Sequence, residues 1–115
     1  MPLLKLETTV PLSEEKGKPL PAALSKTVAG TIGKPKQYVM VAASQSAMLM
    51  SSKAGEAAFV DIRSIGGLSG ETNRKLSQQI CKLLKDSLGI ASDRVYLNFT
   101  DVEAGNWGWN GSTFG

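Results

Sequence analysis

The apolar residues of the sequence repeat when the chain is shifted by 56 positions against itself. Leu4 and Leu6 then fall on Val60 and Ile62. The match continues through the middle of each half, where residues at every fourth position coincide: Leu20, Leu24, Val28 and Ile32 on Leu76, Ile80, Leu84 and Leu88. Such self-similarity indicates copies of one supersecondary unit that share a core. We predict one domain, residues 1–115, built from halves at about 2–57 and 58–115.

Each half has the pattern of a strand, a helix and a second strand. Apolar residues alternate in the strands and recur every fourth position in the helix, and a glycine follows each helix. The predicted elements are Pro2 to Thr8, about Pro19 to Ile32, Tyr38 to Ala43, Ala58 to Ile65, about Gly70 to Leu88, and Arg94 to Thr100. A right-handed crossover makes the two strands of each unit parallel. The prediction is an α+β (α/β) two-layer fold, in which duplicated βαβ units form a four-stranded mixed sheet with two helices on one face.

The ends of the helices and the second face of the sheet give further expectations. Pro19 and Pro21 suit a first helical turn, and Ser69 or Thr72 is expected to cap the second helix. The alternating strands, among them the one containing Val41, leave the sheet face opposite the helices bare and apolar. A large exposed apolar face usually marks an interface that cyclic symmetry can close. We therefore expect an oligomer, with a subunit number that the pattern does not determine.

Composition narrows the class of protein. Hydrophobic residues make up 42% of the 115 residues and charged residues 20%, which is typical of a soluble globular domain. The net charge of +3 comes from scattered lysines, so no nucleic-acid partner is expected. No apolar run reaches the ~20 residues of a membrane span and the start lacks a signal-peptide pattern, so we expect no membrane partner and a cytoplasmic location. One cysteine, Cys81, and no histidine leave few metal arrangements, and we expect no cofactor.

The Met1-Pro2 start offers a candidate catalytic group. Initiator methionine is normally removed before a small residue, which would expose the secondary amine of Pro2. Many chains begin this way and most termini are frayed, but Pro2 opens a predicted core strand. An apolar pocket and a neighbouring lysine would both lower the pKa of such an amine, and a neutral amine can abstract protons. Lys34, held on a short loop between Gly33 and Pro35, is the candidate lysine.

The C-terminal tail concentrates aromatic residues. Trp107, Trp109 and Phe114 are three of the seven aromatics in the chain, and two glycines, Gly108 and Gly111, lie between them. Such a segment either packs across a subunit boundary or walls a ligand pocket, and it can do both. Tyr38 and Tyr96, predicted on strands, would by themselves be ordinary packing residues.

Several short motifs occur in order along the chain: Met1-Pro2, Gly33-Lys34-Pro35 with Gln37-Tyr38, Ser64-Ile65-Gly66, Asn73-Arg74, Asp93 to Asn98, and Gly108-Trp109-Asn110 with Ser112-Thr113-Phe114. Together they resemble the macrophage migration inhibitory factor family of the tautomerase superfamily, along essentially the whole chain. Each motif is weak alone, and the ordered set is specific. The resemblance implies the tautomerase fold of that family and a homotrimer whose sheets form a central barrel, with active sites at the subunit boundaries.

The resemblance also implies an activity and roles for residues. The activity is cofactor-independent keto–enol tautomerisation of phenylpyruvate-like aromatic 2-keto acids, with dopachrome isomerisation as a related reaction, and Pro2 as base and then acid. Lys34 and the backbone amide of Ile65 would bind the carboxylate or carbonyl oxygen. The remaining residues would surround the substrate, with the last two reaching in from the neighbouring subunit: Ser64, Tyr38, Trp109, Phe114, Tyr96 and Asn98.

The sequence departs from the family pattern at several positions. Trp107 replaces a smaller apolar residue near the pocket mouth and should narrow or reshape ring binding. The stretch from Glu56 to Asp61 lacks the Cys-x-x-Cys pair that is associated with thiol redox activity in the vertebrate cytokine of this family. No oxidoreductase activity is therefore expected. Leu12 and Ser46 stand where charged receptor-contact residues would be, which leaves a cell-surface receptor uncertain. The alternative function is a cytokine-like or protein-binding module with vestigial tautomerase activity, and export without a signal peptide stays open.

Overall fold

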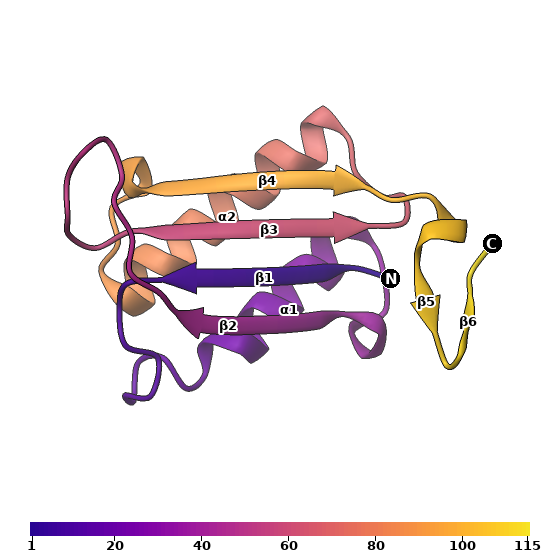
Figure 1. Ribbon diagram of the computed structural model, residues 1–115, viewed down its shortest axis with the longest axis horizontal. Coiled ribbons are helices and arrows are strands. Elements are labelled where there is room, and N and C mark those ends of the chain that lie inside the picture. The colour runs from indigo at the N-terminus through magenta and orange to yellow at the C-terminus, as the bar shows by residue number, and fades with distance from the viewer.

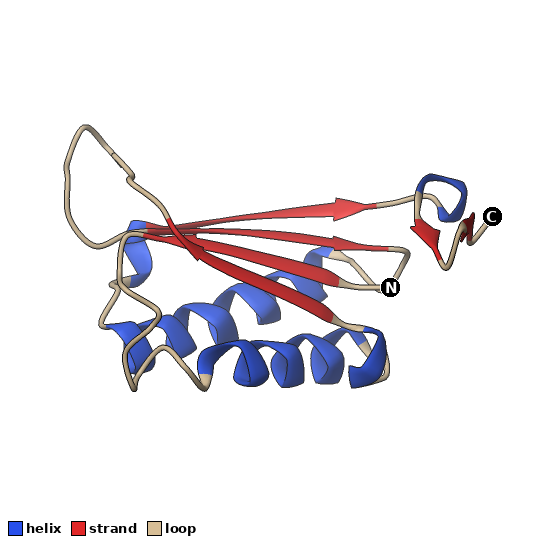
Figure 2. Cartoon of the chain, turned by 60° about the horizontal axis from the view of Figure 1, so that its bottom comes forward, coloured by secondary structure: helices blue, strands red, loops and turns tan.

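Four strands form one mixed sheet, and two helices cover one of its faces (Figures 1 and 2). A computed structural model describes residues 1–115. The strand order is β2-β1-β3-β4, with β1–β2 and β3–β4 parallel and β1–β3 antiparallel. The bounds are β1 Leu3–Thr8, α1 Leu20–Ile32, β2 Met40–Gln45, β3 Ala58–Ser64, α2 Gly70–Leu88 and β4 Val95–Asp101. The predicted fold and its duplicated β-α-β order are confirmed.

The helix ends follow from identifiable residues. Pro19 is the N-cap of α1 and Pro21 lies in its first turn, where a missing amide hydrogen costs nothing. The helix ends at Gly33, whose left-handed φ of 82° suits glycine. Of the two residues considered for the cap of α2, Ser69 performs it, because its hydroxyl accepts a hydrogen bond from the Thr72 amide.

The core lies between the sheet and the helices and uses the duplicated apolar positions. Leu4 and Leu6 of β1 and Val60 and Ile62 of β3 are fully buried against the helices. The helical positions that the repeat identified make up the other side of the core: Leu20, Leu24 and Val28 of α1 and Leu76, Ile80 and Leu84 of α2. Burying a side chain of this size stabilises the fold by about 1.5–3 kcal/mol, so this layer holds the two halves together.

The sheet face away from the helices is more polar than expected. Alternate positions of β1 and β3 point to this face and include Lys5, Glu7, Asp61 and Arg63. Lys5 lies opposite Asp61 in the antiparallel pair, and Asp61 accepts two hydrogen bonds from the Arg63 guanidinium. The prediction of a bare apolar face was wrong, because the side chains that alternate with the core positions on the central strands are charged.

Short helical turns replace the predicted starts of two strands. Lys36–Tyr38 forms a 3-10 helix, η1, in which the Tyr38 amide donates to the Pro35 carbonyl at 3.0 Å. Strand β2 therefore begins at Met40. Tyr38 was predicted on a strand, and that prediction was wrong. Strand β4 is likewise preceded by the 3-10 helix η2, Ser92–Arg94.

The C-terminal tail forms a small hairpin that the sequence analysis did not predict. A 3-10 helix, η3, spans Ala104–Asn106, and strands β5 Gly108–Trp109 and β6 Ser112–Thr113 follow. The two turn residues, Asn110 and Gly111, have φ of 53° and 79°, as a two-residue hairpin turn requires. The hairpin lies beyond the end of the sheet at which the N-terminus lies (Figures 1 and 2).

No helix is both long enough and apolar enough to cross a membrane.

Candidate active site

Four chain segments meet at the end of the sheet where β1 begins. Because β1 and β2 run opposite to β3 and β4, the starts of the first two strands adjoin the ends of the other two. Leu3 pairs with Met40 on one side and with Arg63 on the other. Pro2 is buried, and its carbonyl accepts a hydrogen bond of 3.0 Å from the Met40 amide. The first residues of the chain are therefore fixed in the middle of this end.

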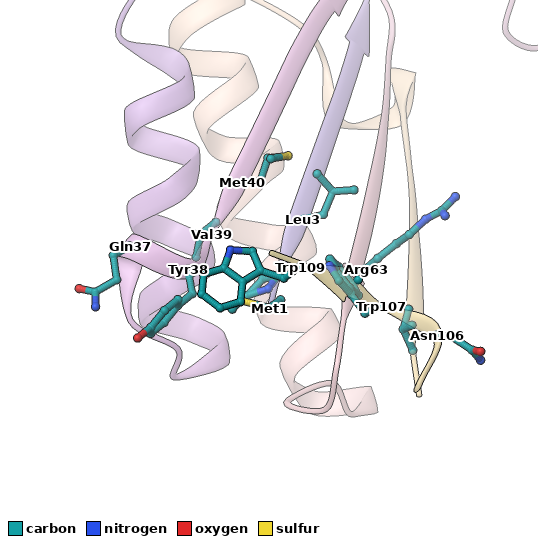
Figure 3. A pocket seen from close by; sticks show the side chains of 13 residues that line it. Met1, Leu3, Gln37, Tyr38, Val39, Met40, Arg63, Asn106, Trp107 and Trp109 are labelled. Carbon is teal, nitrogen blue, oxygen red and sulfur yellow. The ribbon is translucent and has the colours of Figure 1, made fainter. Parts of the chain in front are cut away.

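A cavity of about 560 Å³ opens beside the N-terminus. Figure 3 shows Tyr38 and Trp109 on one side of Met1, with Trp107 and Asn106 on the other. The Arg63 side chain also contributes to the wall, but it extends away from Met1 along the sheet (Figure 3). The wall near the N-terminus is thus mainly aromatic and apolar.

A second cavity of about 440 Å³ also has Met1 in its wall. Its lining includes Lys34 from the loop after α1, Ile65 from the turn after β3, and Phe114 from the tail. Met1 and Tyr38 line both cavities. Met1 therefore adjoins both an aromatic cavity and a cavity whose wall includes a lysine.

An amine at this place is disfavoured in its charged form. Burial lowers the pKa of the Met1 α-ammonium group, and the positive charge of Lys34 lowers it further. In a chain that keeps Met1, the nitrogen of Pro2 belongs to an amide and is not basic. Removal of Met1 would leave the Pro2 amine as the terminal amine beside Lys34.

The tail supplies a preformed aromatic wall. The rings of Trp109 and Phe114 stack with centroids 6.2 Å apart and an interplanar angle of 11°. The Phe114 amide donates to the Trp107 carbonyl at 3.1 Å, which closes the hairpin. Aromatic stacking of this kind contributes about 0.5–1.5 kcal/mol beyond area burial. Trp109 keeps 62% of its surface exposed and is available to a ligand or a neighbouring chain.

Ser64 and Ile65 have different surroundings, although they are neighbours. Ser64 is fully buried, and its hydroxyl donates to the Gly66 carbonyl at 2.7 Å. It lines neither cavity, so the structure gives it a place in the turn and not in the cavity wall. The Ile65 amide donates to no group of the chain, and Ile65 lines the cavity with Lys34. The free donor at this place is therefore a backbone N–H.

Tyr96 and Asn98 are not brought to the cavities within one chain. Both lie on the open face of β4, Tyr96 with 64% of its surface exposed, and neither lines a cavity. The Asn98 side chain donates to the Thr100 hydroxyl at 3.1 Å. Any role for this pair at the N-terminus requires a second chain.

Four residues that line the larger cavity were given no site role of their own from the sequence: Gln37, Met40, Arg63 and Asn106. The strand pairing gives a signal for two of them, because Met40 and Arg63 are the two partners of Leu3. That signal appears only after the order of the strands is known. Gln37 and Asn106 lie in 3-10 turns that no pattern in the sequence indicated.

Groups suited to metal or thiol chemistry are not assembled here. No cluster of three or more His, Cys, Asp or Glu side chains is placed to hold a metal ion. Cys81 lies on α2, packs partly against the core, and has a pKa raised by burial, an effect that a hydrogen bond with Ser92 opposes. The thiol form of Cys81 is therefore favoured.

Duplicated β-α-β units on one mixed sheet, with the chain terminus set in a cavity at its end, define a tautomerase-like fold. A family model described as macrophage migration inhibitory factor (MIF) matches residues 1–115. The MIF of Meriones unguiculatus is 39% identical over 115 residues, which cover 99% of each chain. A MIF homolog of Trichuris trichiura is 38% identical over 99% of this chain and 100% of its own.

Solved structures agree with the sequence relatives. The MIF-like protein of Entamoeba histolytica superposes with a TM-score of 0.93 at 35% identity, covering 98% of both chains. The MIF homologue of Prochlorococcus marinus gives a TM-score of 0.92 at 37% identity, covering 98% of this chain and 99% of that one. The chain belongs to the macrophage migration inhibitory factor family, which includes tautomerase-type enzymes and cytokine-like proteins.

Proposed function

We propose that this chain is a cofactor-independent keto–enol tautomerase of aromatic 2-keto acids such as phenylpyruvate, with related activity on dopachrome-type substrates. The observation that carries the proposal is the place of the Met1 amine, which lines a cavity together with Lys34 and has a pKa lowered by burial and by the Lys34 charge. We infer that the same surroundings act on the Pro2 amine once Met1 is removed. A neutral amine at this place is suited to removing a proton from carbon. The catalytic form is the chain from which Met1 has been removed.

The reaction needs one base and one site for negative charge. The lone pair of the Pro2 nitrogen takes a proton from the carbon next to the ketone. The electrons of that C–H bond form the carbon–carbon double bond, and the carbonyl oxygen becomes an enolate. Lys34 and the free Ile65 amide stabilise this charge. The protonated Pro2 amine then gives its proton to the enolate oxygen, which yields the enol, and the reverse sequence yields the ketone.

The aromatic residues would hold the ring of the substrate. Tyr38 lines both cavities, and Trp107 and Trp109 form the wall of the larger one. Phe114 supports Trp109 through the stacked pair. A substrate with its carboxylate near Lys34 could therefore place a flat ring against these side chains.

The active form that we propose is a homotrimer. Tyr96 and Asn98 are exposed on the open face of β4 and remote from the cavities of their own chain. In a cyclic assembly that covers this face, they would reach the site of a neighbour. Turnover would then depend on assembly as well as on Pro2.

The test uses two changes at the N-terminus. Pro2→Gly, or one alanine inserted between Met1 and Pro2, is expected to lower kcat/KM for phenylpyruvate by about 10²–10⁴-fold, the usual contribution of a general base. Intact mass establishes the N-terminal residue of each preparation. Thermal unfolding and size-exclusion chromatography establish that the fold and assembly are unchanged. Full turnover by either well-folded variant would contradict the proposal.

A further inference from the structure

The turn after β3 is fixed by side chains from two strands. The Gly66 amide donates to a carboxylate oxygen of Asp101 at 3.0 Å. The Ser64 hydroxyl donates to the Gly66 carbonyl at 2.7 Å, and the Val102 amide donates to the Ser64 carbonyl at 2.9 Å. Both polar groups of the Gly66 backbone are therefore held, one by β3 and one by the end of β4.

The same turn is pressed against the end of α1. Gly66 and Gly67 have φ of 72° and 80°, a left-handed conformation that favours glycine. A Cβ atom on Gly67 would lie 2.5 Å from the Ile32 side chain, so only glycine fits there. Ile32 is the last residue of α1, and Lys34 follows two positions later. The turn and the lysine loop are thus placed against each other.

This arrangement fixes the position of one backbone donor, the Ile65 amide. Ile65 lies between the two anchored residues, Ser64 and Gly66, and its amide has no acceptor in the chain. Ile65 lines the cavity that contains Lys34. A donor held in place before the substrate arrives stabilises developing negative charge more effectively than a mobile one.

We propose that Asp101 is a positioning residue for the tautomerase site. Its carboxylate fixes the Gly66 amide and thereby holds the Ile65 N–H toward the oxygen of the bound 2-keto acid. This inference rests on the proposed function. Asp101 is exposed at the end of β4 and lines neither cavity, so it acts through the turn without touching the substrate.

The test separates the hydrogen-bond acceptor from the charge. Asp101→Ala removes the acceptor and the charge, whereas Asp101→Asn removes the charge and keeps a carbonyl oxygen that can accept from Gly66. Glu103→Ala is the control, because it removes a nearby negative charge. The Glu103 side chain makes no hydrogen bond with the chain. Phenylpyruvate turnover, phenylpyruvate affinity measured by NMR, and the exchange rate of the Gly66 amide are recorded for each assembled protein.

Asp101→Ala is expected to lower kcat/KM by about tenfold and to speed Gly66 amide exchange, because one charge-assisted hydrogen bond is lost. Asp101→Asn and Glu103→Ala should both stay within about twofold of the unmodified chain. Equal loss in Asp101→Ala and Asp101→Asn, or full turnover in Asp101→Ala, would overturn the inference while leaving the proposed function in place.

Failure of the proposed function has a different signature. If the unmodified chain binds phenylpyruvate without turning it over, the tautomerase proposal fails, and the same variants then decide the inference by affinity and Gly66 exchange. Weaker binding in Asp101→Ala alone supports the positioning role. Unchanged binding and exchange in that variant, or no phenylpyruvate binding by the unmodified chain, overturns it.

Discussion

The two ends of the sheet carry equivalent segments of the duplicated halves, yet they differ in the chemical groups that they present. In the shift that aligns the halves, Lys34 corresponds to Ile90 and Pro2 to Ala58. Ile90 is fully buried in the core, whereas Lys34 lines a cavity. Ala58 is preceded by more chain, whereas Pro2 lies next to the terminus. A lysine and a terminal amine therefore distinguish one end from the other.

The two ends also differ in whether an equivalent backbone amide has a hydrogen-bond partner. Thr9 is the counterpart of Ile65, and its amide donates to the Ala57 carbonyl at 3.1 Å. Ala57 belongs to the segment that leads into β3, and the corresponding position before β1 is Met1. The Ile65 amide has no such bond. The equivalent backbone donor is therefore paired at one end of the sheet and free at the other.

Among substitutions that exchange residues between the two ends, the largest effect is expected at Lys34. Lys34→Ile introduces the side chain found at Ile90 and removes the cation beside the amine. We expect a loss of about 10²–10³-fold in kcat/KM for phenylpyruvate, comparable with the loss of one oxyanion donor. Steady-state kinetics check this result, with Lys36→Ile as the matched surface control. Equal activity in Lys34→Ile and the control would contradict the role of Lys34.

The same variant has a pH signature. The base must be unprotonated, so activity falls as the pH drops below the pKa of the amine. Burial and, after it, the charge of Lys34 lower the pKa of the Met1 amine, and we expect both to act on the Pro2 amine. Removal of the Lys34 charge should therefore raise the pKa of the Pro2 amine and move the acid limb of the kcat/KM profile to higher pH. A profile that only decreases in height, with its acid limb unmoved, would mean that Lys34 binds substrate without acting on the amine.

A medium effect is expected from the two buried hydroxyls, which occupy equivalent positions. The Thr8 hydroxyl donates to the Ala57 carbonyl at 2.8 Å, and the Ser64 hydroxyl donates to the Gly66 carbonyl at 2.7 Å. Thr8→Ala and Ser64→Ala should each lower the free energy of unfolding by about 0.5–1.5 kcal/mol, the net contribution of one hydrogen bond, because the Ala57 carbonyl keeps the Thr9 amide as a partner and the exposed Gly66 can bind water. Denaturant titration measures this loss.

Turnover should separate the two hydroxyl variants. Ser64→Ala loosens the turn next to Ile65 and is expected to lower kcat/KM for phenylpyruvate, whereas Thr8→Ala acts at the other end of the sheet and should leave it unchanged. A comparable loss of turnover in both variants would show that general stability, and not the turn, controls activity.

The smallest effect is expected at the counterpart of Asp101. Gln45 occupies the equivalent position and donates from its side chain to the Thr9 carbonyl at 3.4 Å on the surface. Gln45→Ala should change the free energy of unfolding by less than about 0.5 kcal/mol and leave turnover unaffected. Thermal unfolding and phenylpyruvate kinetics check both expectations. A tenfold loss of turnover would break the contrast between the two ends.

The sequence predicts the fold well because the fold depends on local periodicity. Leu4, Leu6 and their counterparts in the second half are buried as the alternation requires. Gly33 ends α1 and places Lys34 in the loop, as predicted. The open face was mispredicted as apolar because only the buried positions of the central strands are apolar. Charged residues such as Lys5 and Asp61 alternate with them.

Parts of the candidate site depend on contacts between distant segments and could not be predicted. Asp101 meets Gly66 only because β4 pairs with β3 in a register that places Ser64 beside Asp101. The tail folds back as a hairpin, which brings Trp109 against Phe114. Tyr38 was assigned to a strand because nothing in its neighbourhood distinguishes a strand start from a 3-10 turn.

The central claim is that the amine at the lysine end of the sheet is the base, and an NMR titration of ¹⁵N-labelled Pro2 in the chain without Met1 tests it most directly. We predict that this amine titrates below the pKa of a free proline amine, that its pKa equals the acid limb of the kcat/KM profile, and that both rise together in Lys34→Ile. An amine that titrates like free proline, or a pH profile that does not follow it, would contradict the account.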